Sequence, residues 1–426
     1  MTQQERIISP PKRESAHTHW RRSDLRGLAR LAAQATEGVV RITEGVHQSV
    51  WSTLGLQGRQ VGDEPPRAGG LTGLLYRSVS GLSRGIGWGV EQSLARIESL
   101  LEARTDAAER VESTQRAAWL AALNGVMGDR LEADHNPLAI HMSLRLDNVA
   151  LDLQQPLKIA APCSRVLLMI HGLCMNDLQW CSQQDGHAHD HGRSVAEALG
   201  YSAIYLRYNS GRHVSHNGAE LADLLEQLMQ HWPVPIDELS VLAHSMGGLV
   251  IRSAIQQAGE RGLGWLAHLK HVVFLGTPHH GAPLERAGHG VDRILASSRW
   301  SAPFVRLARL RSAGIIDLRH GNVLDRDWQN GPASARVGDT RIPLPLPPGI
   351  HFHAIAATTA TRRGTLADRL IGDGLVPLDS ALGRHRKARF CLAFADDSTW
   401  ISYRTGHLAL LSRPAVTDRI LGWLGN

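Results

Sequence analysis

Short apolar runs alternate with helical stretches from residue 136 to the C-terminus. Residues 140–145 and 149–153 alternate apolar with polar side chains, as half-buried strands do. Six further runs are mostly apolar, which is typical of strands buried in a parallel sheet. These runs are 166–170, 202–205, 239–242, 272–275, 352–356 and 390–394. Because helical stretches such as 220–232 separate them, the pattern predicts an α/β fold with a mostly parallel central sheet.

The first third of the chain has a different periodicity. Apolar residues spaced by three and four within 25–46, and again within 94–118, predict two amphipathic helices. Between them, glycines recur every fourth residue over 81–89, a stripe that lets helices approach closely, in membranes especially. Arginines interrupt this part of the chain, so we expect a helix that lies on a surface or packs on protein, with membrane contact as the alternative. Residues 1–135 are therefore predicted to form a helical N-terminal extension.

One long interval in the second part of the chain lacks the alternation. Residues 283–350 are too many for an ordinary connection. They include helix-like segments at 291–296 and 304–310 and close on the proline-rich stretch 342–348. This pattern favours a cap or lid over a pocket, with a tolerated surface insertion as the alternative. We expect one domain at 136–426 that carries the cap at about 283–350.

Composition and charge narrow the class of protein. The 426 residues are 43% hydrophobic and 20% charged, an ordinary globular balance. The net charge is +6, but basic and acidic residues are mixed, which favours a solvated surface and no nucleic-acid partner. The four cysteines lack CxxC spacing and fit a reducing compartment. With no signal-peptide pattern and no bilayer-spanning apolar run, we expect a cytoplasmic protein, peripheral membrane association being open.

The segment from Ala243 to Gly247 has the pattern of a nucleophile elbow, with Ser245 at its centre. Such an elbow holds a serine on a strained turn from strand to helix, so that the hydroxyl projects from the sheet. Small residues are needed two before and two after the serine, because strand and helix approach closely there. The usual pattern has glycine at both places, and Ala243 departs from it by one methyl group. Ser245 is the predicted nucleophile if a base and an acid lie within reach.

Asp373 is the best candidate for the acid. In this architecture the partners follow in the order serine, acid, histidine. Asp373 comes soon after the apolar run 352–356, and the glycines on either side of it allow a tight turn. Other aspartates lie in the predicted cap or in a predicted helix and are less well placed. They are Asp317, Asp325, Asp327 and Asp368.

His407 is the best candidate for the base among 23 histidines. It follows the last predicted strand and precedes the closing helix 415–424. Its rivals lie ahead of Asp373, on a strand or in a basic run, where surface or packing roles are expected. They are His351, His353 and His385. The alternative for His407 itself is a structural role as a hydrogen-bonded loop histidine.

Two backbone N–H groups are expected to bind the oxyanion of the tetrahedral intermediate. One belongs to Met246, which follows Ser245 directly. The other belongs to Leu173, in the loop that follows the apolar run 166–170. Because both donors are backbone groups, their side chains are free to shape an acyl pocket.

The region from about Val166 to the C-terminus resembles the α/β-hydrolase superfamily, in particular its lipase and esterase branch and the GPI inositol-deacylase-like serine hydrolases. The matching segments are His171-Gly172-Leu173, Ala243-His244-Ser245-Met246-Gly247-Gly248, Phe274 to Gly281, Gly372 to Pro377 and Gly406-His407. The resemblance implies the α/β-hydrolase fold, with Ser245 as nucleophile, His407 as general base and acid, and Asp373 orienting His407. It names no ester, because one scaffold serves many substrates. The helical first third lies outside it.

Two polar segments invite other readings. Residues 185–191 combine two aspartates with His187, His189 and His191, and histidine-rich tracts do bind metals. Their spacing lacks a helical i, i+4 pair or a cysteine partner, so loop histidines near the pocket mouth are favoured and metal binding stays open. The polar loop 208–213 follows a predicted strand and is expected to line the substrate cleft.

These patterns together predict a serine hydrolase that cleaves carboxylic esters through an acyl-enzyme intermediate, with no metal or organic cofactor. The expected partner is an ester or lipid substrate, because a long cap and an amphipathic first third suit acyl chains. An acyltransferase or a thioesterase with the same triad is an alternative. A further alternative is a non-catalytic protein that uses the hydrolase scaffold to bind lipid or a partner, with the helical extension as the docking element.

Overall fold

The computed structural model describes part of the chain in two compact units, residues 1–116 and 117–426. The described residues are 23–24, 26–27, 30–31, 114–184, 187–282, 311–329, 341–361 and 372–425. The helices predicted within 25–46 and 94–118, and the cap segments at 291–296 and 304–310, lie wholly or largely outside them. Within the described residues, no helix combines the length and the apolar character needed to cross a bilayer.

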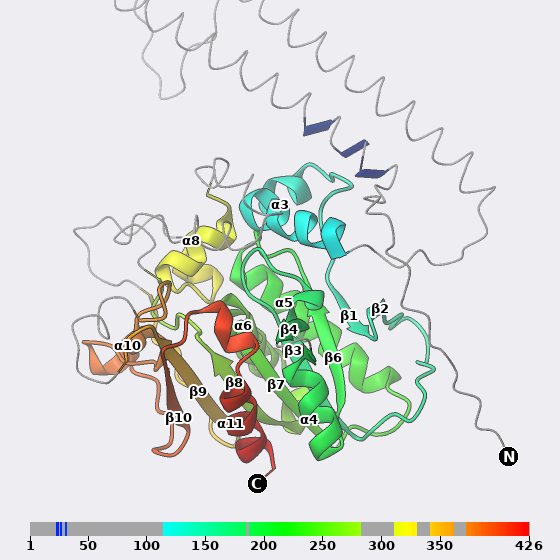
Figure 1. The fold of residues 1–426 in the computed structure, drawn as a ribbon. Coiled ribbons are helices and arrows are strands. Elements are labelled where there is room, and N and C mark those ends of the chain that lie inside the picture. The colour runs from blue at the N-terminus through cyan, green and yellow to red at the C-terminus, as the bar shows by residue number, and fades with distance from the viewer. Residues whose placement is uncertain are drawn as a thin grey trace, which may run out of the picture. The chain divides into compact units, whose positions relative to one another are not determined.

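An eight-stranded sheet forms the centre of the second unit, in the order β10-β9-β8-β7-β3-β6-β1-β2 (Figure 1). The strands are β1 (Ser143–Leu146), β2 (Val149–Ala150), β3 (Arg165–Ile170), β6 (Ser202–Arg207), β7 (Glu238–His244), β8 (Leu269–Leu275), β9 (His351–Thr358) and β10 (Thr399–Tyr403). The strands from β10 to β6 in this order pair in parallel, whereas β1 is antiparallel to both of its neighbours. The predicted α/β class with a mostly parallel sheet is confirmed.

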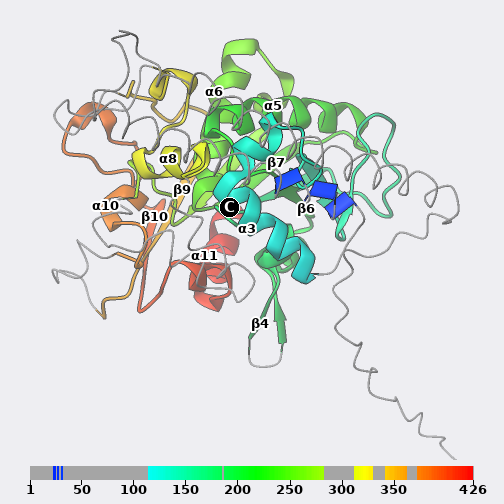
Figure 2. The ribbon, with the colours of Figure 1, turned by 90° about the horizontal axis from the view of Figure 1, so that it is seen from above.

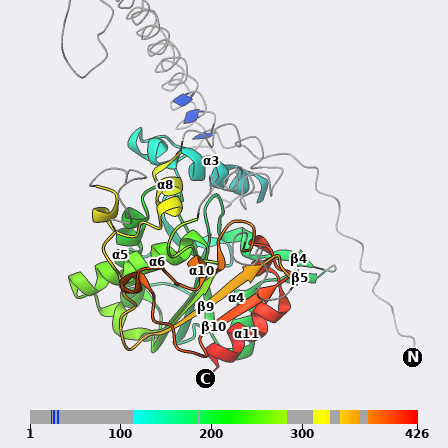
Figure 3. The ribbon, with the colours of Figure 1, turned by 90° about the vertical axis from the view of Figure 1, so that its left-hand side faces the viewer.

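Helices cover both faces of this sheet (Figure 3). Helices α5 (Val214–His231) and α6 (Met246–Arg261) lie on one face, and α4 (His191–Leu199) and α11 (Pro414–Leu424) lie on the other. This double cover explains the uninterrupted apolar run in β3, whose residues 166–170 are fully buried. Glycine ends both α4 and α6 in the left-handed conformation, at φ 71° and 67°, where a side chain would be strained.

Smaller elements surround the sheet. Strands β4 (Ser182–Gln184) and β5 (His187–His189) form a separate antiparallel hairpin, which Figure 2 shows projecting from the rest. Helix α3 (Thr114–Ala133) precedes the sheet in the chain, and α10 (Leu378–Ala381) follows β9. Of the predicted cap, the described residues form α8 (Ala313–His320), a 3-10 turn at Asp325–Asp327 and an irregular segment from Arg341.

The strand predicted at 390–394 is wrong. Residues Ala388–Phe390 form a 3-10 turn, and the last strand is β10, which pairs with β9. The apolar side chains of this run pack as a loop: the Phe394 ring lies 6.2 Å from that of Phe274 and 5.9 Å from that of His279. Phe390 and Leu392 are buried and Phe394 is half-buried, so a loop that packs its larger side chains produced an apolar run that mimics a strand.

Candidate active site

Ser245 lies at the turn between β7 and α6. Its φ of 54° and ψ of −122° are values that a residue with a Cβ atom rarely adopts. Backbone hydrogen bonds fix this turn, because Ser245 N–H donates to the Leu275 carbonyl at 2.8 Å and Gly248 N–H donates to the Ser245 carbonyl at 3.0 Å. Ser245 thus occupies a strained strand-to-helix turn, the geometry in which a nucleophile elbow presents its hydroxyl.

Two glycines allow other segments to approach Ser245 closely. A Cβ atom on Gly247 would lie 2.7 Å from the carbonyl oxygens of both Ile170 and His171. A Cβ atom on Gly172 would lie 3.0 Å from the Cβ of Ser245. The first turn of α6 therefore packs against the end of β3 and the loop that follows it, and any side chain at 247 would push the two apart.

Asp373 and His407 form a buried hydrogen-bonded pair. His407 Nδ1–H donates to Asp373 Oδ2 at 2.6 Å, and both side chains are buried. The other carboxylate oxygen, Oδ1, accepts from the N–H groups of Leu375 at 2.9 Å and Val376 at 2.8 Å. His407 N–H also donates to the Asp373 carbonyl at 3.1 Å. Because a carboxylate only accepts, the proton of a neutral His407 ring sits on Nδ1 and Nε2 keeps its lone pair.

The turn that carries Asp373 needs its two glycines. Gly372 and Gly374 have φ of 54° and 96°, in the left-handed region that glycine adopts without strain. A Cβ atom on Gly372 would also clash with the Val376 carbonyl. These glycines fold the carboxylate back onto the N–H groups of its own turn and toward His407.

Ser245 and His407 approach each other without a direct hydrogen bond. A Cβ atom on Gly276 would lie 3.2 Å from His407 Cε1, and Gly276 directly follows Leu275, the residue that holds Ser245 N–H. Among the hydrogen bonds of the described residues, none joins the Ser245 hydroxyl to His407 Nε2. Catalytic hydrogen bonds are often long or poorly aligned before substrate binds. The structure therefore brings Asp373 and His407 into contact and places Ser245 near them without closing the chain of hydrogen bonds.

The two oxyanion-hole candidates lie on either side of Ser245. Met246 begins α6, and Leu173 follows Gly172, whose Cα faces the Ser245 side chain. In the described part of the chain, neither N–H group donates to a protein acceptor. Both residues are buried, at 0% and 2% exposure, so their side chains belong to the core beside the turn. Two N–H groups without protein partners are what an oxyanion requires.

Buried histidines flank the pair, a feature that the sequence does not reveal. The His244 ring lies 4.7 Å from the His407 ring, and His244 Nε2–H donates to the His407 carbonyl at 3.3 Å. Burial lowers the pKa of His244 well below its usual value, and the charge of His407 lowers it further. Burial also lowers the pKa of His171 to about 4. Both rings are therefore neutral near pH 7 and add no positive charge beside His407.

Helix α3 supports the loop that carries Leu173. The Cα of Gly125 faces Cys174, where a Cβ atom would clash with the sulfur. Asn209 Nδ2 donates to the Gly128 carbonyl at 2.9 Å, and residues 208–210 are buried. The loop 208–213, expected to line the cleft, thus begins beneath α3. The sequence signal for this packing is the pair of glycines within a helix that otherwise has good helix formers.

Two of the rival residues, Asp317 and His353, have structural roles. Asp317 is fully buried and accepts from Val214 N–H at 2.8 Å and from His213 Nδ1 at 2.9 Å. His353 stacks on Trp423 with ring centroids 4.6 Å apart. Asp368 lies outside the described residues. These contacts explain why such residues are polar without involving them in the candidate site.

The histidine cluster divides between the hairpin and α4. His189 lies on β5, whereas His191 is the first residue of α4 and is buried. Thr417 Oγ1–H donates to His191 Nδ1 at 2.9 Å, and His191 Nε2–H donates to the Leu410 carbonyl at 2.8 Å. Within the described residues, no group of three His, Cys, Asp or Glu side chains is arranged to hold a metal, and Asp185 lies outside them. His191 instead ties α4 to the segment just after His407.

A comparison with known families matches one segment of the chain. Residues 163–298 match the family described as "Putative serine esterase (DUF676)". This segment contains Ser245, Met246 and Leu173 and ends ahead of Asp373 and His407. No curated protein matches the sequence.

Several solved structures are similar to this chain. A mature lipase from Bacillus licheniformis is 17% identical over 67% of this chain and 97% of its own, with a TM-score of 0.39. A lipase-esterase related protein from Clostridium acetobutylicum is 12% identical over 67% of this chain and 98% of its own, with a TM-score of 0.33. A thioesterase of the prodiginine pathway from Streptomyces coelicolor is 15% identical over 64% of this chain and 96% of its own, with a TM-score of 0.35.

Proposed function

We propose that this protein is a serine hydrolase that cleaves carboxylic esters. The observation that carries the proposal is the 2.6 Å hydrogen bond from His407 Nδ1 to Asp373 Oδ2, close to a serine held on a strained strand-to-helix turn. Because Nδ1–H donates to the carboxylate, the Nε2 lone pair is left to act as a base. The serine esterase description of residues 163–298 supports the same chemistry for Ser245.

The proposed reaction has two halves. The Ser245 oxygen bonds to the ester carbonyl carbon while its proton passes to His407 Nε2, and Asp373 stabilises the imidazolium that results. The N–H groups of Leu173 and Met246 bind the oxyanion. The tetrahedral intermediate then expels the alcohol, which takes the proton from His407, and leaves an acyl group on Ser245. Water attacks this acyl-enzyme with His407 again as base, releasing the acid and restoring the serine.

We propose an acyl-chain or lipid ester as the substrate, in keeping with the GPI inositol-deacylase-like resemblance. In this proposal residues 136–426 form the hydrolase domain, about 283–350 form its cap, and 1–135 form a helical extension that contacts a membrane peripherally in the cytoplasm. Of the proposed extension, most of α3 lies within the compact unit that begins at Ala117. No metal or organic cofactor enters the proposed steps.

A fluorophosphonate probe tests the nucleophile directly. The full-length protein should be labelled, Ser245→Ala should lose the label, and Ser194→Ala, which removes a hydroxyl from α4, should keep it. A folded wild-type sample that takes no label would reject the proposal and favour the non-catalytic binding protein. If Ser245→Ala and Ser194→Ala are labelled to the same extent, Ser245 is not the nucleophile.

A substrate panel then separates the enzymatic alternatives. p-Nitrophenyl esters of graded chain length, the matching thioesters and an added alcohol acceptor distinguish an esterase from a thioesterase and an acyltransferase. We expect ester hydrolysis to dominate, with rates on long chains rising when lipid vesicles are added. Faster turnover of thioesters, or transfer of the acyl group to the alcohol in place of water, would assign one of the alternatives.

A further inference from the structure

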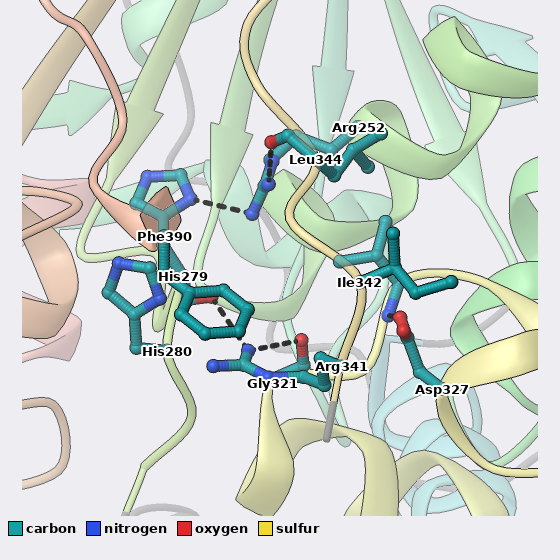
Figure 4. A pocket seen from close by; sticks show the side chains of 10 residues that line it. Arg252, His279, His280, Gly321, Asp327, Arg341, Ile342, Leu344 and Phe390 are labelled. Atoms are coloured by element: carbon teal, nitrogen blue, oxygen red, sulfur yellow. Dashed lines mark hydrogen bonds between the residues drawn. The ribbon is translucent and has the colours of Figure 1, made fainter. Parts of the chain in front are cut away.

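A second polar site lies beside α6, between the loop after β8 and the segments 321–327 and 341–344 (Figure 4). Figure 4 shows charged groups and imidazole rings gathered around one cavity. The side chains that matter are Arg252, His279, His280, Asp327, Arg341 and Phe390. None of them takes part in the ester chemistry proposed above, so this cavity needs an explanation of its own.

Arg252 brings a positive charge into the cavity. It lies seven residues after Ser245 on α6, about 10 Å along the helix axis, and is only 7% exposed. Its guanidinium donates to the Leu344 carbonyl at 2.9 Å and lies 3.5 Å from His279 Nδ1, both neutral groups. Within the described residues it forms no salt bridge. A buried guanidinium without a carboxylate partner is energetically costly, so the site favours an anion.

A second guanidinium strengthens this preference. Arg341 donates to the carbonyls of Gly321 at 2.8 Å and His279 at 3.3 Å, so the cavity lies between two arginines. Burial, with the positive charge of Arg341 as the next cause, lowers the pKa of Arg252 to about 10, and the negative charge of Asp327 opposes this shift. Arg252 therefore remains charged at neutral pH although two like charges share the site.

His279 is a neutral neighbour of Arg252 in this cavity. Arg252 can only donate, so the neutral His279 ring presents a lone pair at Nδ1 and carries its proton on Nε2. Burial lowers the pKa of His279 well below its usual value, which keeps the ring neutral. His279 is 1% exposed, and its Nε2, which has no hydrogen-bond partner among the described residues, lies on the opposite side of the ring from Nδ1. His279 therefore adds no charge beside Arg252 and presents no N–H donor to a ligand that Arg252 binds.

Asp327 sets a limit on the charge of that ligand. Its Oδ2 accepts from the N–H groups of Val323 and Leu324, both at 2.9 Å. Asp327 lines the same cavity, and its buried Oδ1 has no hydrogen-bond partner among the described residues. A carboxylate oxygen at this position repels a fully ionised oxyanion and instead accepts from a ligand that carries a hydroxyl. Inorganic phosphate keeps at least one hydroxyl at neutral pH, and a phosphate monoester loses its second proton only with a pKa of about 6, so both provide these two features.

We propose that this cavity binds a phosphate group that keeps one acidic proton. Arg252 donates to its oxygens, Arg341 adds positive charge, and its hydroxyl donates to Asp327 Oδ1. This inference goes beyond ester hydrolysis and does not depend on it. The phosphate group has two sources, free inorganic phosphate or the headgroup of a phosphomonoester lipid, and the experiments below separate them.

Calorimetric titration of the full-length protein with inorganic phosphate tests the site. We expect saturable binding that Arg252→Gln weakens by at least about tenfold, because hydrogen bonds to charged groups are worth this much. The matched control is Arg261→Gln, which removes an exposed guanidinium from the last turn of the same helix and should bind as the wild type does. No binding by the wild type, or equal affinity in both variants, overturns the proposal.

Sulfate provides a test that needs no variant at Arg252. Sulfate matches phosphate in shape but carries no hydroxyl near neutral pH, so it should bind at least about tenfold more weakly. Asp327→Asn, whose amide can donate to sulfate, should reduce this preference. Equal binding of the two anions by the wild type overturns the role of Asp327. If Arg252→Gln fails to fold, Arg341→Gln replaces it, with weaker phosphate binding expected.

Vesicle sedimentation identifies the source of the phosphate. Phosphatidylcholine vesicles with and without phosphatidic acid are spun with the full-length protein. Binding that needs phosphatidic acid, falls in Arg252→Gln and is displaced by inorganic phosphate assigns the lipid headgroup. Phosphate binding without sedimentation assigns the free ion. Either result supports a phosphate site and neither reads catalysis, so a failure of the esterase proposal would be seen separately.

Discussion

The turn around Ser245 and the pair formed by Asp373 and His407 are held in place by different forces. At Ser245, close packing dominates, because the Cα of Gly247 approaches two carbonyl oxygens at the end of β3. At Asp373, hydrogen bonds dominate, because every carboxylate oxygen has a donor. The turn should therefore be sensitive to added volume, whereas the pair should be sensitive to loss of a donor or an acceptor.

The two regions also differ in how the chain assembles them. The turn uses consecutive residues between β7 and α6, so its pattern is local. Asp373 and His407 are 34 residues apart and meet only when β10 pairs with β9. A substitution that keeps the shape of a side chain but changes its hydrogen bonds should therefore reduce activity most at Asp373 and His407. A substitution that adds or removes a methyl group should change stability most at the turn around Ser245.

The largest effect is expected from Asp373→Asn, which keeps the shape of the side chain but removes its charge. An amide can donate to His407 Nδ1 and thereby favour the wrong tautomer. We expect kcat/KM for a p-nitrophenyl ester to fall by about 10³- to 10⁴-fold. Asp379→Asn, at an exposed position on α10, is the control and should retain activity. Thermal unfolding of both variants shows whether the fold is kept, and a folded Asp373→Asn variant with full activity would remove Asp373 from the mechanism.

A second prediction concerns acid stability through His191, which ties α4 to the segment after His407. Burial lowers its folded-state pKa to about 4, so between pH ~6.5 and ~4 the unfolded chain binds a proton that the folded protein does not. Stability from this residue is therefore complete above pH ~6.5 and is lost as the pH falls toward ~4, by about 3 kcal/mol.

The variant His191→Gln tests whether stability falls with pH in this direction. The variant should be less stable at pH 7.5, because it loses the fit to Leu410 and Thr417. Its free energy of unfolding should nevertheless fall less than that of the wild type between pH 6.5 and 4, as urea titrations at each pH would show. His351→Gln, at an exposed position, should follow the wild-type curve. If His191→Gln loses as much stability in this window as the wild type does, the ring is not a buried neutral histidine.

The contrast between a local pattern and contacts of distant segments explains how much of the fold could be predicted from the sequence. The apolar runs predicted the parallel strands β3 and β6 to β9, because strands buried on both faces leave an uninterrupted signal. The run at 390–394 misled, since Phe390 is buried and Phe394 contacts the rings of Phe274 and His279 in a segment that forms no strand. The roles of Ser245, Asp373 and His407 stay predictions of the local motifs until activity is measured.

Contacts between distant segments could not be predicted. The packing of α3 against Cys174 and the burial of His244 beside His407 join residues far apart in the chain. The cavity at Arg252 likewise combines α6 with residues beyond 320, and no local pattern marks it. Periodicity reports which face of one element is buried, but it carries no information about which other element covers that face.

The third prediction tests the packing at the turn. Gly247→Ala adds a methyl group 2.7 Å from two carbonyl oxygens, so we expect the free energy of unfolding to fall by about 2 kcal/mol. Gly259→Ala, on the same helix, meets only one Leu266 atom at 3.8 Å and should stabilise the protein by about 0.5–1 kcal/mol. Denaturant titration of both variants measures the difference. Equal effects at the two positions would show that close approach does not determine the residue at 247.

The smallest expected effect is a difference in stability between two variants at Ser245, in which glycine and alanine separate backbone strain from loss of the hydroxyl. Both substitutions remove the hydroxyl, so both should abolish probe labelling. Only Ser245→Gly removes the Cβ atom that is strained at φ 54°, so it should be more stable than Ser245→Ala by about 1 kcal/mol. At Ser194, inside α4, the order should reverse, because glycine destabilises a helix by about 0.5–1 kcal/mol relative to alanine. The melting temperatures of the glycine and alanine variants at positions 245 and 194, each compared with the wild type, measure both differences. If Ser245→Gly is no more stable than Ser245→Ala, the Cβ atom at position 245 is not strained. Hydrogen bonds would then determine the geometry of the turn around Ser245, as they do for the pair formed by Asp373 and His407.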